Sequence, residues 1–261
     1  MMQSFFVDLG RKVFAFLQFL GGLSNLVSQS FYWLFIPPLK TRRVLEQAKR
    51  AGLDSLPIVS LIGLFIGMIF AFQTAYLMQR LGSEMYIASI VALSLVRELG
   101  PVITSLVVAG RVGAAITAEI GSMQVTEQID ALEAMATNPV KYLVVPRLLA
   151  LSLMLPILTL YADIVGILGG WLICVYKLGI PSRLYMNITF ESLKFKDLFT
   201  GLSKTIFFGM IIAFVSCYEG FSVEGGAEGV GRATTRSVVW SFILIIAADC
   251  FFTALFYFIF P

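Results

Sequence analysis

Two adjacent residues of opposite charge, Arg97 and Glu98, interrupt a long apolar run, and the step Gly100-Pro101 follows them directly. A charge inside an apolar membrane span costs about 2.5–3.5 kcal/mol on insertion scales, so it usually needs a buried partner or a watery cavity. Adjacent helical residues do not face each other, so a mutual ion pair is poor. Arg97 could therefore bind a phosphate or another anionic head group. Alternatively, both residues pair with side chains on other helices, such as Asp163 or Asp249.

The residue types that catalysis and metal binding need are largely missing from this sequence. It contains no histidine, no CxxC pair, no Ser/His/Asp set and no GxxxxGK[ST] phosphate loop. The nearest match to that loop, residues 201–205, lacks the rest of the motif. Cys174, Cys217 and Cys250 lie far apart in apolar surroundings, as core thiols do. We therefore expect no enzyme activity, metal, cofactor or nucleic-acid partner for this chain, and any ATP it needs must bind to another chain.

The composition is that of a membrane protein with several spanning helices. Hydrophobic residues make up 58% of the 261 residues, charged residues make up 13%, and the mean hydropathy is +0.88. Recurrent long apolar runs are typical of polytopic membrane proteins. We predict an all-α fold with transmembrane helices over about 56–78, 85–118, 148–176, 201–218 and 238–260. The first span contains Gly63, Gly67 and Ala71, a ridge of small residues that favours close helix packing.

The second predicted span, 85–118, is too long to cross a membrane without a bend. About 34 residues measure roughly 50 Å, whereas the hydrocarbon core is ~30 Å thick. The Gly100-Pro101 step can supply the bend. Near the end of this span, Arg111 and Glu119 are expected to tie the helix to its neighbours. Of the connecting segments, 177–199 can hold a short surface helix, and the glycine-rich stretch 219–237 is predicted to be a loop.

The region 1–55 precedes the predicted membrane domain, 56–261. Residues 1–36 are apolar but interrupted by Gly21-Gly22 and polar residues, so we predict one or two helices in the membrane surface rather than a span. A crossing by residues 13–36 stays open. A basic cluster follows, and the positive-inside rule places it in the cytoplasm. The resulting topology has a cytoplasmic N-terminus and a C-terminus on the opposite side.

A short polar helix is predicted over residues 127–136, with Thr126 as its N-cap and Asn138-Pro139 as its stop. Ten residues measure only ~15 Å, so this helix cannot span a membrane. One of its faces is apolar and another is acidic. The apolar residues are Ile129, Leu132 and Met135 or Ala136, and the acidic residues are Glu127, Asp130 and Glu133.

Long motifs in the sequence resemble the MlaE-type permeases. They are ALSLVRELGP, AGRVGAAITAEIGSM, TEQIDALEAMATNP and GRATTRSVV followed by ADCFFTALF, and the resemblance covers roughly residues 40–260. Such permeases are membrane subunits of ABC transporters that move phospholipids or other lipids between the bacterial inner membrane and the outer envelope. The resemblance implies a homodimer of five-span subunits in the inner membrane. It also implies two cytoplasmic ATPase subunits that bind ATP and Mg²⁺, a periplasmic MCE-domain lipid-binding protein and a possible small accessory subunit.

The resemblance assigns roles to residues already singled out. The helix 127–136 matches the coupling helix, so Glu127, Ile129, Asp130, Leu132, Glu133 and Met135 are expected to contact the ATPase. The expected substrate-binding residues are Arg97 and Glu98 together with Phe72, Tyr76 and Leu77 of the first span. Arg232 and Arg236, one helical turn apart, are expected to bind anionic head groups or the ATPase on the cytoplasmic side.

Three other classes of function remain open on the residues alone. A secondary transporter or channel would use Arg97, Glu98, Asp163 and Asp249 as an ion path and would need no ATPase. A membrane-embedded lipid enzyme would have to rely on carboxylates, since histidine is absent. A structural scaffold for an envelope assembly would need neither transport nor catalysis.

Overall fold

The structure is a computed structural model that describes residues 2–37 and 40–259, with the backbone alone for residues 2–13, 15, 16 and 259. All regular elements in these ranges are helices, which confirms the predicted all-α fold. The α-helices are α1 (Met2–Leu34), α2 (Thr41–Ala51), α3 (Leu56–Arg80), α4 (Ile87–Ser94), α5 (Gly100–Val108), α6 (Ala114–Val125), α7 (Gln128–Ala134), α8 (Val145–Tyr176), α9 (Ser182–Ser192), α10 (Phe195–Phe221) and α11 (Gly226–Ile259). The shorter turns are the 3₁₀ segments η1 (Leu53–Ser55) and η2 (Glu84–Tyr86) and the π segments η3 (Leu95–Leu99), η4 (Ala109–Gly113) and η5 (Val140–Val144).

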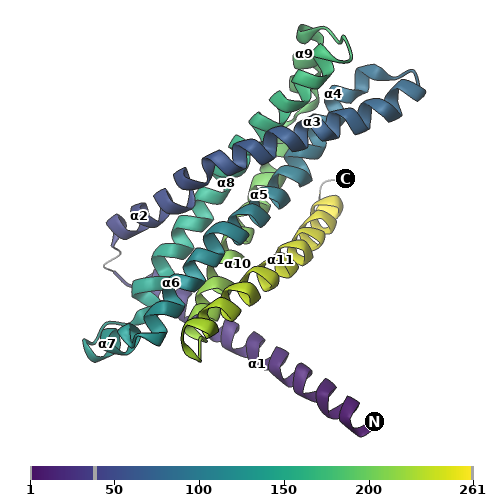
Figure 1. Cartoon of the computed structure of the whole chain (residues 1–261). Coiled ribbons are helices and arrows are strands. Elements are labelled where there is room, and N and C mark those ends of the chain that lie inside the picture. The colour runs from purple at the N-terminus through teal and green to yellow at the C-terminus, as the bar shows by residue number, and fades with distance from the viewer. Residues whose placement is uncertain (1, 38–39, 260–261) are drawn as a thin grey trace.

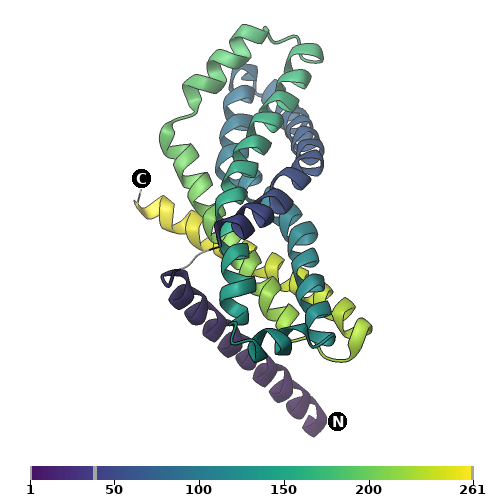
Figure 2. The same ribbon diagram turned by 90° about the vertical axis from the view of Figure 1, so that its left-hand side faces the viewer.

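Five helical stretches are long and apolar enough to cross a membrane, which confirms the predicted number of spans. They are Thr41–Arg80, Glu84–Val125, Val140–Tyr176, Phe195–Phe221 and Gly226–Phe258. The helix α8 has α3 and α10 as its main neighbours, and α10 in turn packs against α6 and α11. Figures 1 and 2 show α7 and the α10–α11 turn at one end of the bundle, and α9 with the α3–α4 hairpin at the other. The connections between successive spans therefore alternate between the two ends of the bundle.

Small residues bring α3 and α8 into close contact, as the predicted ridge requires. A Cβ atom built on Gly67 would lie 1.8 Å from the carbonyl oxygen of Gly166. A Cβ atom on Gly169 would lie 2.3 Å from the carbonyl oxygen of Leu64. Neither position can hold a larger side chain unless the helices move apart, so the ridge serves helix packing.

The predicted bend in the second span coincides with a π turn. The π segment η3 ends at Leu99, directly before Gly100-Pro101. Proline has no N–H group, so Pro101 cannot donate to the carbonyl group of Arg97 four residues earlier, and the helical ladder is interrupted there. Such π turns are frequent at functional sites. The bend therefore leaves a backbone acceptor at Arg97 that another side chain can use.

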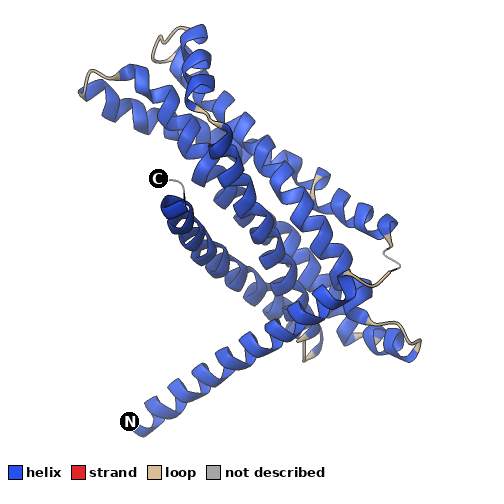
Figure 3. Ribbon diagram, turned by 180° about the vertical axis from the view of Figure 1, so that it is seen from behind, coloured by secondary structure: helices blue, strands red, loops and turns tan. Residues whose placement is uncertain are grey.

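The N-terminal region contains one of the one or two helices that the sequence allowed. Residues Met2–Leu34 form a single continuous helix through Gly21-Gly22. The segment contains no proline, so every backbone N–H can continue the ladder, and Gly22 lets the ring of Tyr218 pack against the helix. Figure 3 shows α1 leaving the bundle at an angle, with its N-terminal half far from the other helices.

The structure also decides the predictions for two connecting segments, 177–199 and 219–237. The predicted surface helix within 177–199 is confirmed as α9. The predicted loop 219–237 is wrong over most of its length, because α10 continues to Phe221 and α11 begins at Gly226. Only the turn between them is irregular, and Gly225 and Gly226 have positive φ angles of 87° and 70°, which side chains other than glycine rarely adopt. The glycines therefore make the turn rather than a long loop.

The expected ties at the end of the second span are confirmed. The guanidinium group of Arg111 donates to the hydroxyl oxygen of Ser55 at 2.7 Å. The carboxylate of Glu119 lies 3.1 Å from a guanidinium nitrogen of Arg147 and 3.6 Å from one of Arg50. Because Arg147 is buried in α8, these contacts join α2, α6 and α8.

Candidate substrate site and coupling surface

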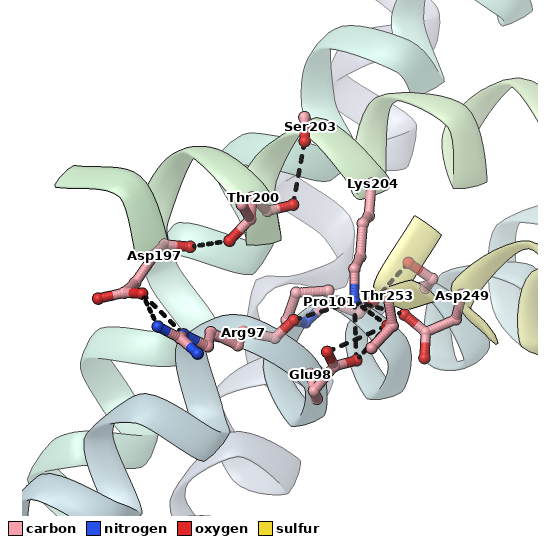
Figure 4. A network of polar contacts seen from close by, with 10 residues as sticks. Arg97, Glu98, Pro101, Asp197, Thr200, Ser203, Lys204, Asp249 and Thr253 are labelled. Atoms are coloured by element: carbon pink, nitrogen blue, oxygen red, sulfur yellow. Dashed lines mark hydrogen bonds and ion pairs between the residues drawn. The ribbon is translucent and has the colours of Figure 1, made fainter. Parts of the chain in front are cut away.

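Two charged residues of the second span, Arg97 and Glu98, belong to a cluster that joins three helices (Figure 4). Arg97 and Glu98 come from the π turn η3, and their partners come from α10 and α11. The partners are Asp197, Lys204, Asp249 and Thr253. As expected, Arg97 and Glu98 do not pair with each other.

Lys204 lies at the centre of this cluster. Its side chain is 2% exposed, and its ammonium nitrogen lies 2.8 Å from Glu98 Oε2 and 3.0 Å from Asp249 Oδ1. The same ammonium group donates to the carbonyl oxygen of Arg97 at 3.3 Å and to the hydroxyl oxygen of Thr253 at 2.7 Å. The Arg97 carbonyl is the acceptor that Pro101 leaves free. The proline bend and the buried lysine therefore form one unit that holds η3 against α10 and α11.

Arg97 has its own partner, Asp197, at the first turn of α10. Arg97 Nε donates to Asp197 Oδ1 at 2.7 Å, and Asp197 Oδ2 accepts from the backbone N–H of Lys194 at 2.9 Å. The Asp197 side chain is 3% exposed, whereas that of Arg97 is 52% exposed. Asp197 therefore holds one edge of a guanidinium group that still reaches the outside of the chain.

The predicted partner Asp163 takes no part in the cluster, so this prediction is wrong. Asp163 is buried on α8 against Gly100, and neither carboxylate oxygen has a hydrogen-bond partner within the described residues. The other predicted partner, Asp249, does join the cluster, through Lys204. An Arg97–Asp163 pair fails because Arg97 points towards α10, as its bond to Asp197 shows.

A cavity of about 160 Å³ opens beside Arg97 and Glu98. Its wall combines charged residues of the cluster with two aromatic residues of α11. The lining residues are Arg97, Glu98, Lys196, Asp197, Thr200, Lys204, Thr253, Phe256 and Tyr257. A polar head group and an adjoining apolar chain would both find matching surface here.

The three predicted substrate residues of α3 lie elsewhere. Phe72, Tyr76 and Leu77 are exposed on the outer face of α3, at 49%, 59% and 54%. None of them lines the cavity beside Arg97. Within one chain, the structure therefore does not bring the two halves of the predicted substrate site together.

The short helix predicted over 127–136 is present as α7 but is shorter, Gln128–Ala134. Glu127 precedes it in the left-handed conformation, with φ 57°, and Ala136 follows it with φ 55°. The N–H groups of Ala136 and Thr137 donate to the carbonyl groups of Glu133 and Leu132, which closes the helix in a Schellman motif. The prediction of Thr126 as the N-cap of this helix is wrong. The hydroxyl group of Thr126 donates instead to the carbonyl oxygen of Ser122 at the end of α6.

The surface of α7 is mainly acidic. Glu127, Asp130 and Glu133 are exposed, and Met135 is 67% exposed beside them. Ile129, in contrast, is buried in the chain's own core, and Leu132 packs partly against that core. The apolar face therefore anchors α7 to the bundle, and the acidic residues with Met135 form the surface that faces outwards.

Comparisons with known proteins decide the family. The family described as permease MlaE matches residues 44–255. A probable ABC transporter permease protein of Rickettsia felis is 44% identical over 250 residues, which cover 96% of each chain. A probable ABC transporter permease protein of Synechocystis is 41% identical over 87% of this chain and 86% of its own. The chloroplastic protein TRIGALACTOSYLDIACYLGLYCEROL 1 of Arabidopsis thaliana is 40% identical over 83% of this chain and 62% of its own.

The chain belongs to the MlaE permease family. It is a multi-pass membrane subunit of an ABC transporter rather than the ATPase itself, and an ABC permease works with cytoplasmic ATPase partners. The predicted resemblance is thereby confirmed.

The two arginines of the permease at the start of α11 are each paired. Arg232 contacts Glu228 at 2.6 Å, and Arg236 contacts Glu219 at 3.0 Å. Both line a groove of about 710 Å³ together with Trp240. The predicted basic contacts therefore lie on a helix, at the same end of the bundle as α7.

Two residues of the charge cluster escaped the sequence-based reasoning. Lys204 was considered only as part of a failed phosphate-loop match, although a lysine inside an apolar span carries the same cost as Arg97 and was a visible signal. Asp197 lies within the connecting segment predicted over 177–199, because the next span was predicted to begin near residue 201. The helix α10 begins earlier, at Phe195, and includes Asp197. Their pairing with η3 joins residues about 100 positions apart, which no local pattern indicates.

Proposed function

We propose that this permease moves phospholipid or a related lipid between the inner membrane and the outer envelope, driven by two cytoplasmic ATPase subunits. The observation that carries this proposal is the cavity beside η3, where the half-exposed guanidinium group of Arg97 lies next to Phe256 and Tyr257. An arginine suits a phosphate or other anionic head group, and the aromatic rings suit the start of an acyl chain. The name of the Arabidopsis relative is itself that of a glycolipid.

The proposed assembly is a homodimer. Along α11, Ile243, Ile246 and Phe251 are exposed at 49%, 56% and 61%, and the outer face of α3 is similarly apolar. A second copy packed against these faces would complete the wall of the cavity, which one chain leaves open, and would add Phe72, Tyr76 and Leu77 to it. A periplasmic MCE-domain protein would take up the lipid, with a small accessory subunit as a further component. The N-terminus and α7 would then lie on the cytoplasmic side.

The proposed energy transfer runs through α7. Its exposed acidic residues Glu127, Asp130 and Glu133 would meet basic residues of an ATPase, with Met135 as the apolar contact. ATP and Mg²⁺ belong to that partner in this proposal. An ion path through the charge cluster would instead give transport without ATP.

The test is lipid transfer by the permease reconstituted with its ATPase in liposomes. We expect Arg97→Gln to lower ATP-dependent transfer by about tenfold or more, because a hydrogen bond to a charged group contributes about 1.5–3 kcal/mol. Arg42→Gln, an exposed change of the same kind on α2, should leave transfer unchanged. Equal transfer with and without ATP would refute the ABC mechanism.

A second variant separates head-group binding from structure. Arg97→Gln leaves the buried carboxylate of Asp197 without its partner, which could by itself disturb the fold. Arg97→Gln combined with Asp197→Asn removes that buried charge. If Arg97 binds the lipid, the double variant regains stability but not transfer. If transfer returns as well, Arg97 serves only to neutralise Asp197 and the proposed site is wrong.

A further inference from the structure

A second cavity, of about 310 Å³, lies between the end of α1, the start of α2 and the segment that follows α7. This basic pocket is lined by Trp33, Lys40, Arg43, Val44, Ala136, Thr137, Asn138, Lys141, Tyr142, Val145 and Pro146. Its volume lies at the lower end of the roughly 300–1,000 Å³ of small-ligand pockets. It shares no residue with the cavity beside Arg97.

Three cations and no carboxylate line the basic pocket. Lys40, Arg43 and Lys141 form no ion pair with any carboxylate of the residues that the structure describes. The two buried cations of the described residues, Arg147 and Lys204, do have carboxylate partners. The pocket therefore carries an uncompensated positive charge, and an anion bound in it would be attracted from several sides.

Aromatic rings and a carbonyl group hold these cations in place. The guanidinium carbon of Arg43 lies 3.3 Å and Lys40 Nζ lies 5.0 Å from the ring centre of Tyr142. Lys141 Nζ lies 5.3 Å from the ring centre of Trp33 and donates to the carbonyl oxygen of Pro37 at 3.3 Å. Two positive groups over one ring repel each other, so an anion between them would relieve that repulsion.

The surroundings of the pocket suit a membrane surface. Tyr32 and Phe35, beside Trp33 at the end of α1, are 64% and 80% exposed. Aromatic residues of this kind gather at the level of lipid head groups. Lysines and arginines next to a membrane surface attract anionic lipids, and the positive-inside rule places this end of the chain at the leaflet where such lipids create a negative potential.

The pocket also reaches the end of α7. Ala136, the left-handed residue that closes α7, and the following Thr137 are part of its wall. Lys141, also part of the wall, donates to the carbonyl oxygen of Pro37, which follows α1. A ligand in the pocket would thus contact both the N-terminal linker and the segment that sets the position of α7.

We propose that the basic pocket binds the phosphate-bearing head group of an anionic phospholipid and so fixes the α1–α2 linker and α7 to the membrane surface. This lipid is a bound ligand of the permease and not its transported substrate. The proposal does not depend on which lipid the transporter moves. An anionic phosphate could belong to a lipid or to a free ion. The exposed rings of Tyr32 and Phe35, which lie beside the pocket residue Trp33, favour a lipid.

The test is native mass spectrometry of the purified full-length permease, titrated with phosphatidylglycerol or with zwitterionic phosphatidylcholine. We expect Arg43→Gln combined with Lys141→Gln to weaken phosphatidylglycerol binding about 25-fold, which is roughly fivefold for each cation removed. Phosphatidylcholine binding should change by less than about twofold. The matched control, Arg42→Gln with Lys49→Gln, removes the same charge from exposed positions of α2 outside the pocket and should bind as the wild type does.

A single variant of the basic pocket gives a second test of the same lipid binding. Lys40→Gln, an exposed change that leaves the core intact, should weaken phosphatidylglycerol binding about fivefold. Unchanged binding in both pocket variants would overturn the proposal. Pocket-dependent binding of inorganic phosphate, with no preference for the lipid, would assign the site to a free anion and also overturn it. Loss of ATPase co-purification without any change in lipid binding would assign the pocket to the ATPase interface instead.

Discussion

Replacement of Lys204 by methionine should destabilise the permease strongly. The variant keeps the length of the side chain but removes the ammonium group that lies between Glu98 and Asp249. Removing one partner of a buried ion pair costs about 3–5 kcal/mol, because the remaining charge stays buried without compensation. The side chains of Glu98 and Asp249 are 40% and 20% exposed, so water can compensate part of this loss. We therefore expect a loss near the lower end of that range, about 3 kcal/mol.

The assay is reversible unfolding of the purified permease in mixed micelles, followed by circular dichroism. The exposed change Lys177→Met is the control and should shift the free energy of unfolding by less than about 0.5 kcal/mol. Adding Glu98→Gln and Asp249→Asn to Lys204→Met removes the uncompensated carboxylates and should restore most of the lost stability. A loss below about 1 kcal/mol for Lys204→Met, or no recovery in the triple variant, would refute the view that charge compensation holds η3 to α10 and α11.

Three further predictions concern packing, capping and coupling. Gly67→Ala should lower the free energy of unfolding by about 2–3 kcal/mol in the same assay, because its Cβ would meet the backbone of α8. The control Gly21→Ala, whose Cβ would have no atom within 4 Å, should be neutral or stabilising. Equal effects of the two variants would contradict the close α3–α8 contact. Ala136→Gly should slow hydrogen exchange in α7 by an amount equivalent to about 0.5–1 kcal/mol, since glycine adopts the left-handed conformation freely, and faster exchange would contradict this. Asp130→Lys on α7 should abolish co-purification of the ATPase without lowering the yield of the permease itself. The control Glu191→Lys on α9, at the other end of the bundle, should leave co-purification unchanged. A normal ATPase yield with Asp130→Lys would argue against α7 as the docking element.

Local features of the chain were predictable because they depend on neighbours in the sequence. The five spans follow from apolar runs of sufficient length, and the bend follows from a proline that removes a backbone donor. The ridge of Gly63 and Gly67 follows from spacing on one helix face. Errors arose where local signals competed. The glycine-rich stretch before Arg232 was predicted to be a loop, yet without proline it continues as a helix from Gly226.

The sequence by itself determined that this protein is an all-helical membrane permease, that charges lie inside its spans, and that a short acidic helix follows the second span. Which charges pair was decided only by the tertiary structure. Asp163 looked as suitable a partner as Asp249, but the direction of η3 and the position of α10 bring Asp197 and Lys204 to Arg97 and Glu98 instead. Hydropathy and spacing act along one helix, whereas the partner of a buried charge depends on how separate helices pack around it.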